Sequence, residues 1–232
     1  MGGLFVFIEQ KLSKYKKQSE KINIEYKEND HKYFWMCVII ILSGYLIVFL
    51  AYFPGIFGYD VEGQLGQHIK GYTTHHPLAH TILLEKFYNL VVDNRNFGMA
   101  LYTICQMSFL ALCNAFLILF LKRIGVGLKW RNLWIVMATV HPVFSVLSIS
   151  ITKDIYFTGF FILLCTLYAY FEMDKNIFYK KWYKCLLLLS IFGVGLFRNN
   201  GLYILLFVML FIMYNYINHK KNGHLKKYLF IQ

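Results

Sequence analysis

Charged side chains are scarce in this sequence: Asp, Glu, Lys and Arg make up only 16% of its 232 residues, whereas 58% are apolar and 19% are aromatic. These fractions exclude an ordinary soluble domain. Because the apolar residues also cluster in long runs, the composition predicts an integral membrane protein. The sequence has no internal repeat, no low-complexity tract and no recognisable soluble domain, so we expect one membrane domain.

A cleavable signal peptide is also missing. The first 32 residues are basic and polar, and no small-residue cleavage site follows the first apolar run, which is therefore interpreted as an uncleaved signal-anchor. The cysteines show neither a disulfide framework nor a metal-binding spacing. They all fall within apolar runs, which is typical of buried thiols: Cys37, Cys105, Cys113, Cys165 and Cys185.

What the sequence does contain is a series of apolar stretches. A membrane-spanning helix needs about 20 mostly apolar residues, and six stretches reach or approach this length, of which the fifth is the weakest. We therefore predict an all-α, polytopic membrane fold with a membrane domain over 33–217 and spans near 33–54, 98–121, 133–151, 154–171, 182–197 and 201–217.

The distribution of basic residues predicts how these spans are oriented. With the N-terminus inside the cell, nineteen of the twenty-four Lys and Arg residues lie in cytoplasmic segments, which is the pattern of multi-pass proteins in a cell membrane. Both termini are then cytoplasmic. The basic N-terminal segment 1–32 contains an amphipathic pattern over 4–17 that predicts a helix lying on the inner leaflet, and a basic tail covers 218–232. The excess charge favours membrane lipids as partners over nucleic acid.

The segment 55–97 then becomes a long external loop, and long loops are often functional. An apolar stripe formed by Val61, Leu65 and Ile69 predicts a first helix, with Asp60, Gln64, Gln67 and His68 on its opposite face. A second helix is predicted after Pro77, with its apolar stripe at Ala79, Leu83, Phe87 and Val91. We expect both helices to lie along the membrane surface.

Polar residues gather on this external side, both in the loop and in the two short turns near residues 153 and 198. Charge at a membrane boundary usually has a partner or a function. Simpler roles stay open: Asp154 is also placed to N-cap the fourth span, Lys153 to pair with Asp154, and the histidines to form a helix-start turn. The candidate site residues are Asp60, Glu62, Gln64, His75, His76, Lys153, Asp154, Arg198 and Asn199.

The order of features after the first span is distinctive: Pro-Gly, then an aspartate, then a His-Pro turn that opens a helix. This order resembles the first external loop of the GT-C-type integral membrane glycosyltransferases. The closest likeness is to an uncharacterised bacterial branch of multi-pass proteins. The residues that carry it are Pro54, Gly55, Asp60, Glu62, Gln64, His76 and Pro77, with Lys153-Asp154 and Arg198-Asn199 as the short polar turns.

The resemblance implies transfer of a sugar from a polyprenyl-phosphate donor on the external face, for assembly of cell-envelope glycans. Such a transfer needs a base for the acceptor hydroxyl and cations for the departing phosphate. Asp60, with Glu62 as second choice, is the candidate base, and Lys153 and Arg198 are the candidate phosphate ligands. The likeness implies no definite cofactor and leaves a divalent cation, Mg²⁺ or Mn²⁺, open. The remaining expected substrate contacts are Gln64, His75, His76, Asp154 and Asn199.

The chain departs from the family pattern in two respects: the family commonly has more spans, and its acid pair is often adjacent. A truncated, inactive scaffold of the same family is therefore one alternative. Another alternative is a transporter or accessory membrane subunit, whose polar groups would lie near the middle of the membrane on broken helices. Only Gln106, Asn114 and the His141-Pro142 pair fit that description.

Overall fold

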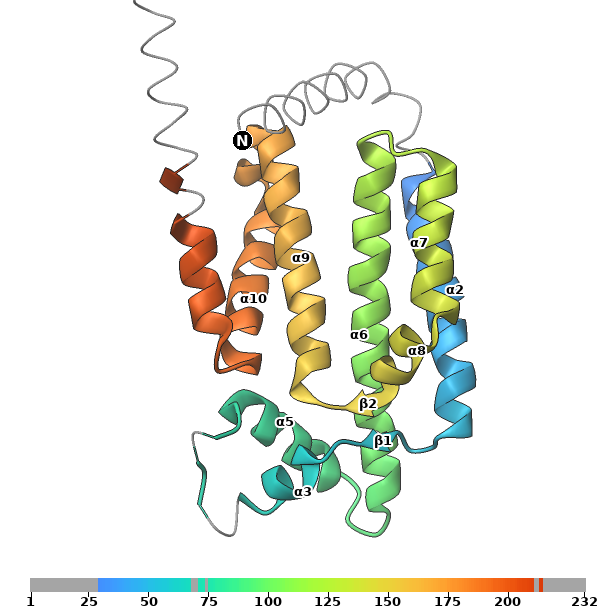
Figure 1. Ribbon diagram of the computed structural model, residues 1–232, viewed down its shortest axis with the longest axis vertical. Helices are drawn as coiled ribbons and strands as arrows, with labels where there is room; N and C mark the ends of the chain where they lie inside the picture. The colour runs from blue at the N-terminus through green and yellow to red at the C-terminus, as the bar shows by residue number, and fades with distance from the viewer. Residues whose placement is uncertain (1–28, 68–70, 74, 211–212, 215–232) are drawn as a thin grey trace, which may run out of the picture.

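The computed structural model describes residues 29–67, 71–73, 75–210 and 213–214 (Figure 1). The helix expected over 4–17, the tail 218–232 and the positions of His68 and Ile69 lie outside the described residues. The described part is a bundle of long helices with a smaller module at one end. Apart from one pair of two-residue strands, its regular elements are helical, which confirms the all-α class.

Three helices are long and apolar enough to cross a membrane: α2 (Asp30–Ala51), α6 (Arg95–Arg123) and α9 (Lys153–Met173). A fourth span results if α7 (Leu128–Val140) and α8 (Pro142–Ile149) are taken together. After the short 3₁₀ helix η1 (Lys175–Tyr179), helix α10 (Lys181–Phe197) has 17 residues, and the apolar helical stretch Gly201–Leu210 is shorter still. The described helices thus support three or four spans, and six remains a prediction.

The third predicted span is not continuous. Helices α7 and α8 meet at an angle of 52°, at the His141-Pro142 step. Pro142 has no backbone N–H and is the first residue of α8, where that donor is not needed. The Nδ1 atom of His141 accepts a hydrogen bond from the backbone N–H of Val143 at 3.3 Å, so the histidine N-caps α8. The break is therefore built from local chemistry.

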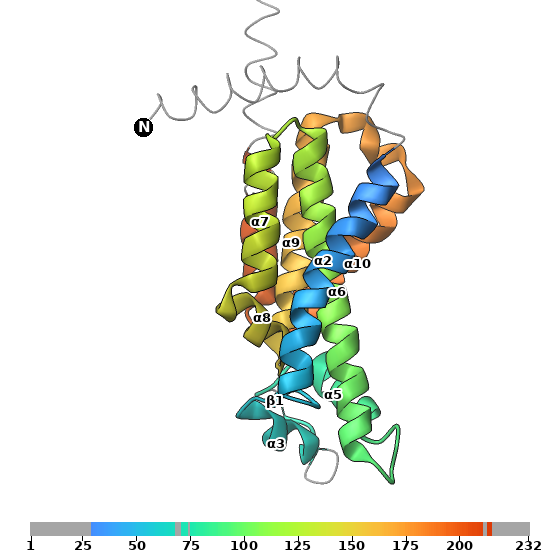
Figure 2. The same cartoon turned by 90° about the vertical axis from the view of Figure 1, so that its right-hand side faces the viewer.

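Helix α6 lies at the centre of the bundle. It packs against α2 on one side and α9 on the other, and also contacts α7 and α8 (Figure 2). Its buried positions recur along the whole helix, from Met99 near its start to Phe120 near its end. Close packing of these side chains is a main stabilising contribution between helices that span a membrane.

Residues 55–94 form the loop module, which contains α3 (Asp60–Leu65) and α5 (Leu78–Tyr88) and lies beyond the ends of α9 and α10 (Figure 1). Helix α5 packs against the start of α6 at Gly98. A Cβ atom on Gly98 would lie only 2.2 Å from the carbonyl oxygen of Phe87, so this approach requires glycine. The module is thereby held against the bundle.

The buried faces of the two module helices differ from those predicted. In α3 the polar residue Gln64 is buried together with Val61, although Gln64 was placed on the opposite, polar face. In α5 the buried residues are His80, Thr81, Leu84 and Glu85, whereas Leu83 and Phe87 of the predicted stripe are only partly buried. The reason is tertiary: α5 lies between α3, α6 and α10, so it is covered from more than its apolar side.

The two ends of the bundle differ in charge. At the end where α2 begins and α6 and α9 terminate, the described segments 29–32, 122–132 and 172–184 contain nine Lys or Arg residues and three carboxylates. At the opposite end, the loop module with Lys153, Asp154 and Arg198 contains five carboxylates and, in its described part, three cations. The basic excess thus collects at one end of the fold.

Candidate functional site

A short parallel strand pair brings distant parts of the chain together. Strand β1 (Ile56–Phe57) follows α2, and strand β2 (Ser150–Ile151) precedes α9. They pair with Ile56 opposite Ser150 and Phe57 opposite Ile151. Since Asp60 follows β1 closely and Lys153 follows β2, this register places the start of α3 beside the start of α9.

Helix α6 holds both strands in position. The Thr103 hydroxyl donates a hydrogen bond to the carbonyl oxygen of Pro54 at 2.9 Å, just before β1. The Gln106 amide donates to the carbonyl oxygens of Ser148 at 2.9 Å and Ser150 at 2.8 Å. The backbone that breaks the helical pattern between α8 and α9 is therefore hydrogen-bonded, as buried backbone must be. Gln106 acts here as a support for the strands.

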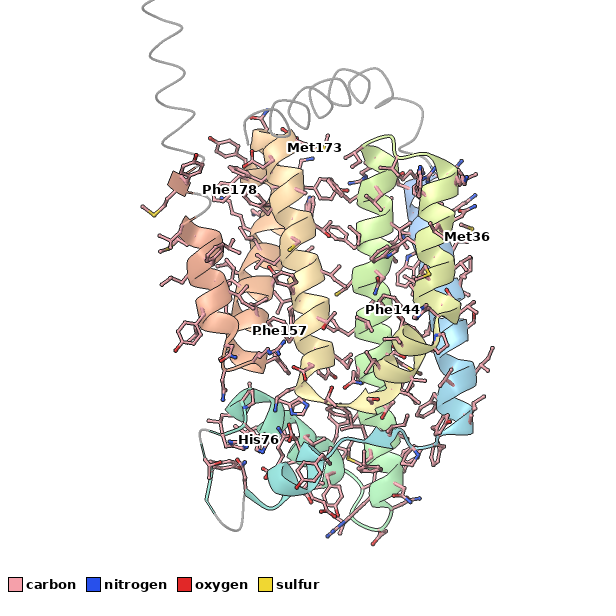
Figure 3. All side chains as sticks on the ribbon, in the orientation of Figure 1. Met36, His76, Phe144, Phe157, Met173 and Phe178 are labelled. Carbon is pink, nitrogen blue, oxygen red and sulfur yellow. The ribbon has the colours of Figure 1, made fainter. Side chains whose placement is uncertain are left out.

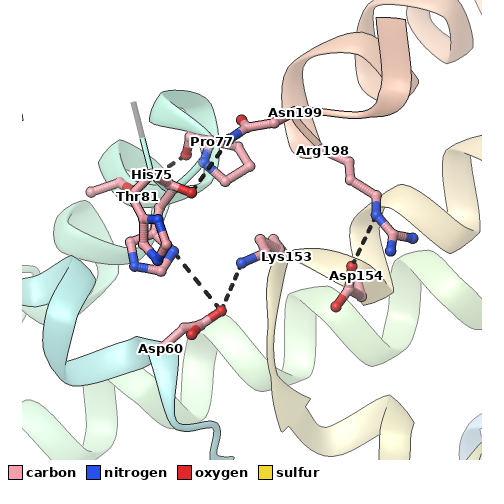
Figure 4. Close-up of polar contacts among 9 residues, drawn as sticks. Asp60, His75, Pro77, Thr81, Lys153, Asp154, Arg198 and Asn199 are labelled. Atoms are coloured by element: carbon pink, nitrogen blue, oxygen red, sulfur yellow. Dashed lines mark hydrogen bonds and ion pairs between the residues drawn. The ribbon is translucent and has the colours of Figure 1, made fainter. Parts of the chain in front are cut away.

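Asp60 and Lys153 form the centre of the candidate site (Figure 4). The Lys153 Nζ atom lies 2.6 Å from Asp60 Oδ2. The Asp60 side chain is 49% exposed and that of Lys153 is 21% exposed, so the pair stands at a surface. The hydrogen bond from Lys153 lowers the pKa of the Asp60 carboxyl below its usual 3.8, which outweighs the opposing effect of partial burial. Asp60 is therefore ionised at neutral pH.

His76 lies on the other side of the same carboxylate. Its Nδ1 atom is 3.9 Å from Asp60 Oδ2, and only 9% of its side chain is exposed. Burial, and then the charge of Lys153, lower the pKa of His76 below its usual 6.5, so its imidazole is neutral at pH 7. The exposed His75 packs its ring edge to face against that of His76, with centroids 4.7 Å apart. Figure 3 shows His76 within the loop module.

A second ion pair lies on the bundle side of the site. The Arg198 Nε atom is 3.7 Å from Asp154 Oδ1 (Figure 4). The guanidinium lies 5.0 Å from the centre of the Phe157 ring. The next residue, Asn199, donates from its side chain to the carbonyl oxygen of His75 at 3.3 Å. The end of α10 is thus joined to the loop module. Asp154 does not N-cap α9, because the N-cap is Thr152.

Glu62 and Gln64 occupy different environments although both belong to α3. Glu62 is two residues from Asp60, which corresponds to nearly the opposite side of a helix, and its side chain is exposed. Gln64 is on the Asp60 side, 1% exposed, and its amide nitrogen has no hydrogen-bond partner in the described structure. Asp60, His76 and Lys153 are therefore brought together, with Arg198 and Asp154 as a neighbouring pair, whereas Glu62 is set apart.

A buried polar pair beneath the site was not anticipated from the sequence. His80 Nε2 lies 2.7 Å from the hydroxyl oxygen of Tyr102, and the two residues are 1% and 0% exposed. The one available signal was a further histidine near the start of the helix predicted after Pro77. Burial lowers the pKa of His80 to about 4.

This buried histidine makes the stability of the protein pH-dependent. Its folded pKa of about 4 is below the usual 6.5, so on acidification the unfolded chain gains a proton first and stability falls from pH 6.5 towards 4. Between pH 7.5 and 5, protonation of this histidine in the unfolded chain should lower the free energy of unfolding by about 2 kcal/mol. A His80→Gln variant can still hydrogen-bond Tyr102 but does not titrate. In detergent, its unfolding temperature should fall less over this pH range than that of the parent protein; an equal fall would contradict the assignment.

The site residues do not fit the divalent cation that the family resemblance left open. Among the described residues, no group of three or more His, Cys, Asp or Glu side chains is arranged to hold a metal ion. In addition, Lys153 Nζ already contacts Asp60 Oδ2, the carboxylate oxygen that faces His76. A positive charge at this position opposes the binding of a second cation.

Comparison with known proteins identifies a family for this chain. No curated protein and no solved structure matches the chain. A family of unknown function, DUF6020, matches residues 70–221, which is more than half of the sequence. The matched region contains His75, His76, Lys153, Asp154, Arg198 and Asn199, whereas Asp60 and Glu62 precede it. The chain therefore belongs to the DUF6020 family of proteins of unknown function.

Proposed function

We propose that this protein transfers a sugar from a polyprenyl-phosphate donor to a hydroxyl acceptor at the loop-module end of the bundle. The acceptor oxygen attacks C1 of the sugar while the bond from C1 to the phosphate oxygen breaks. The acceptor proton passes to the Asp60 carboxylate, and the bonding electron pair leaves with the phosphate. Lys153 and Arg198 stabilise the charge that develops on the leaving phosphate.

The observation that carries the proposal is the contact between Asp60 and Lys153, whose side chains lie 2.6 Å apart although 93 residues separate them. A base and a cation in contact, with the Arg198–Asp154 pair adjacent, are the groups that this transfer needs. These groups lie where α9 begins and α10 ends. A donor can therefore keep its lipid chain beside the helices while its phosphate reaches the site.

The paired state also suggests how the base becomes active. While Lys153 donates to Asp60, the pKa of Asp60 is lowered and the carboxylate is a weak base. A donor phosphate that attracts Lys153 weakens this hydrogen bond, and the basicity of Asp60 rises. Proton transfer is thereby favoured only when the donor is bound.

We infer that the loop module lies outside the cell membrane and that both chain termini are cytoplasmic. The uneven charge of the two ends of the bundle supports this orientation, since basic residues stay inside. Val92 in the module is 72% exposed, and Lys129 at the opposite end is also exposed. In a cysteine-free background, Val92→Cys should react with an impermeant thiol reagent in intact cells and Lys129→Cys only after permeabilisation. The reverse pattern would reject the orientation.

The activity itself is tested with the full chain in proteoliposomes, a radiolabelled polyprenyl-phosphate sugar and lipid-extracted envelope glycan as acceptor. We expect label in the acceptor fraction that depends on the protein. Absence of transfer, with donor binding also absent, would favour the carrier or inactive-scaffold alternatives. The carrier alternative gains no support from Gln106, Asn114 and His141, because each of these side chains has a structural hydrogen bond.

A further inference from the structure

A cluster of charged side chains lies at the end of the bundle opposite to the loop module. Asp30 of α2 accepts hydrogen bonds from two consecutive residues of α6: Lys122 Nζ and Arg123 Nε each lie 2.8 Å from one of its carboxylate oxygens. The Lys122 and Asp30 side chains are only 8% and 10% exposed. We call these three residues, Asp30, Lys122 and Arg123, the basic cluster. Its partly buried ion pairs connect α2 to α6.

A third cation joins the basic cluster through Tyr33. Lys122 Nζ lies 5.0 Å from the centre of the Tyr33 ring, and the Arg131 guanidinium of α7 lies 5.2 Å from it. Lys122 and Arg123 thus share the Asp30 carboxylate, and Arg131 adjoins them through the Tyr33 ring. Cation–π contacts stabilise these charges in part, and positive charges held close together attract an anion. The cluster therefore favours a bound anion.

An apolar groove leads away from this cluster along the bundle. It has a volume of about 360 Å³ and runs between α6, α8 and α9, with Leu110 and Phe144 among its lining residues. Val143 and Leu147 in its wall are 55% and 48% exposed, so the groove is on the outside of the bundle.

Two aromatic residues connect the groove to the cluster. Phe120 lines the groove, and its ring centre is 4.5 Å from that of Tyr170. The Tyr170 hydroxyl accepts a hydrogen bond from Arg123 Nη1 at 3.1 Å. An anion-binding end and an apolar channel therefore adjoin, which is the shape of an amphipathic lipid. Trp35 and Trp130 are exposed at the same end, as expected of residues at a membrane interface.

We infer that this end of the protein binds an anionic phospholipid, with the phosphate on Lys122, Arg123 and Arg131 and one acyl chain in the groove. The lipid phosphate places a negative charge beside the three cations, and the bound lipid links α6 to α7 and α9. A free phosphate ion satisfies the cations alone, whereas a phospholipid satisfies both the cations and the groove. This site is independent of the proposed sugar transfer, since it lies at the opposite end of the bundle.

The test measures lipid binding to the full chain in maltoside micelles by native mass spectrometry, with dioleoyl phosphatidylglycerol and dioleoyl phosphatidylcholine as probes. Phosphatidylglycerol should bind more tightly. Arg131→Gln should weaken it about fivefold, the usual contribution of one basic side chain near an anionic lipid, and leave phosphatidylcholine unchanged. The matched control is Lys129→Gln, which removes an exposed charge from the same helix and should change binding by less than about twofold.

A second variant tests the groove separately. Ala169 of α9 lines the groove, and Ala169→Phe fills it without changing charge. It should also weaken phosphatidylglycerol binding, and unfolding temperatures identify any variant that fails to fold. Equal binding of the two lipids, or equal loss in Arg131→Gln and Lys129→Gln, would overturn the proposal. The proposal would also be overturned if inorganic phosphate raised the unfolding temperature as much as phosphatidylglycerol does. The same holds if the purified protein retained an isoprenoid lipid rather than an acyl lipid.

Discussion

Replacing Asp60 with asparagine is expected to lower the rate of sugar transfer by about 10²–10⁴-fold, the usual contribution of a general base. Asparagine keeps the size of the side chain and a hydrogen-bonding oxygen, but that oxygen cannot accept the acceptor's proton. Loss of the ion pair with Lys153 should cost little stability, about 0.2–1 kcal/mol, because the Asp60 side chain is half exposed. The measurement is the rate of label transfer at matched protein content, together with the unfolding temperature.

Two further variants separate the role of Asp60 from other effects. Glu62→Gln removes a carboxylate from nearly the opposite side of α3 and should leave the rate within about twofold, because Glu62 does not contact Lys153. Arg198→Ala should lower kcat/KM for the donor while leaving the base intact, since Arg198 is assigned to the phosphate. Near-normal transfer by Asp60→Asn would remove this carboxylate from the mechanism, and a large loss in Glu62→Gln would assign the base to Glu62.

Replacing Asp30 with asparagine should destabilise the bundle by about 3 kcal/mol, because it leaves Lys122 and Arg123 without their common carboxylate. The estimate is at the lower end of the range for a buried pair, since the Arg123 side chain is 41% exposed and is solvated in part. In a chain of this length it corresponds to a fall of roughly 6–12 °C in the unfolding temperature. The measurement is thermal unfolding in a neutral detergent, without added anionic lipid.

The matched control for this variant is Asp93→Asn, which removes one carboxylate from an exposed position in the loop module. It should shift the unfolding temperature by no more than about 2 °C, the effect of a typical surface substitution. If Asp30→Asn and Asp93→Asn shift the temperature equally, the ion pairs of Asp30 contribute nothing specific. In that case the contact between α2 and α6 depends on apolar packing alone.

The sequence determined the helical class, because long apolar runs in a chain with few charges have no stable alternative to helices. It also determined the break at His141-Pro142, since proline cannot continue the hydrogen-bonding pattern of a helix. The presence of two helices in the 55–97 loop followed from local apolar periodicity. Each of these features depends on interactions between residues that are near one another in the chain.

Tertiary structure decided which polar residues meet and which are buried. Asp60 and Lys153 come into contact because β1 pairs with β2 in one register and α6 anchors both strands through Thr103 and Gln106. The burial of His80 and Gln64 depends on elements packed around α5 and α3, which no periodicity within those helices encodes. The physical reason is that local patterns fix the type of each element, whereas side-chain neighbours depend on contacts between segments that are far apart in sequence.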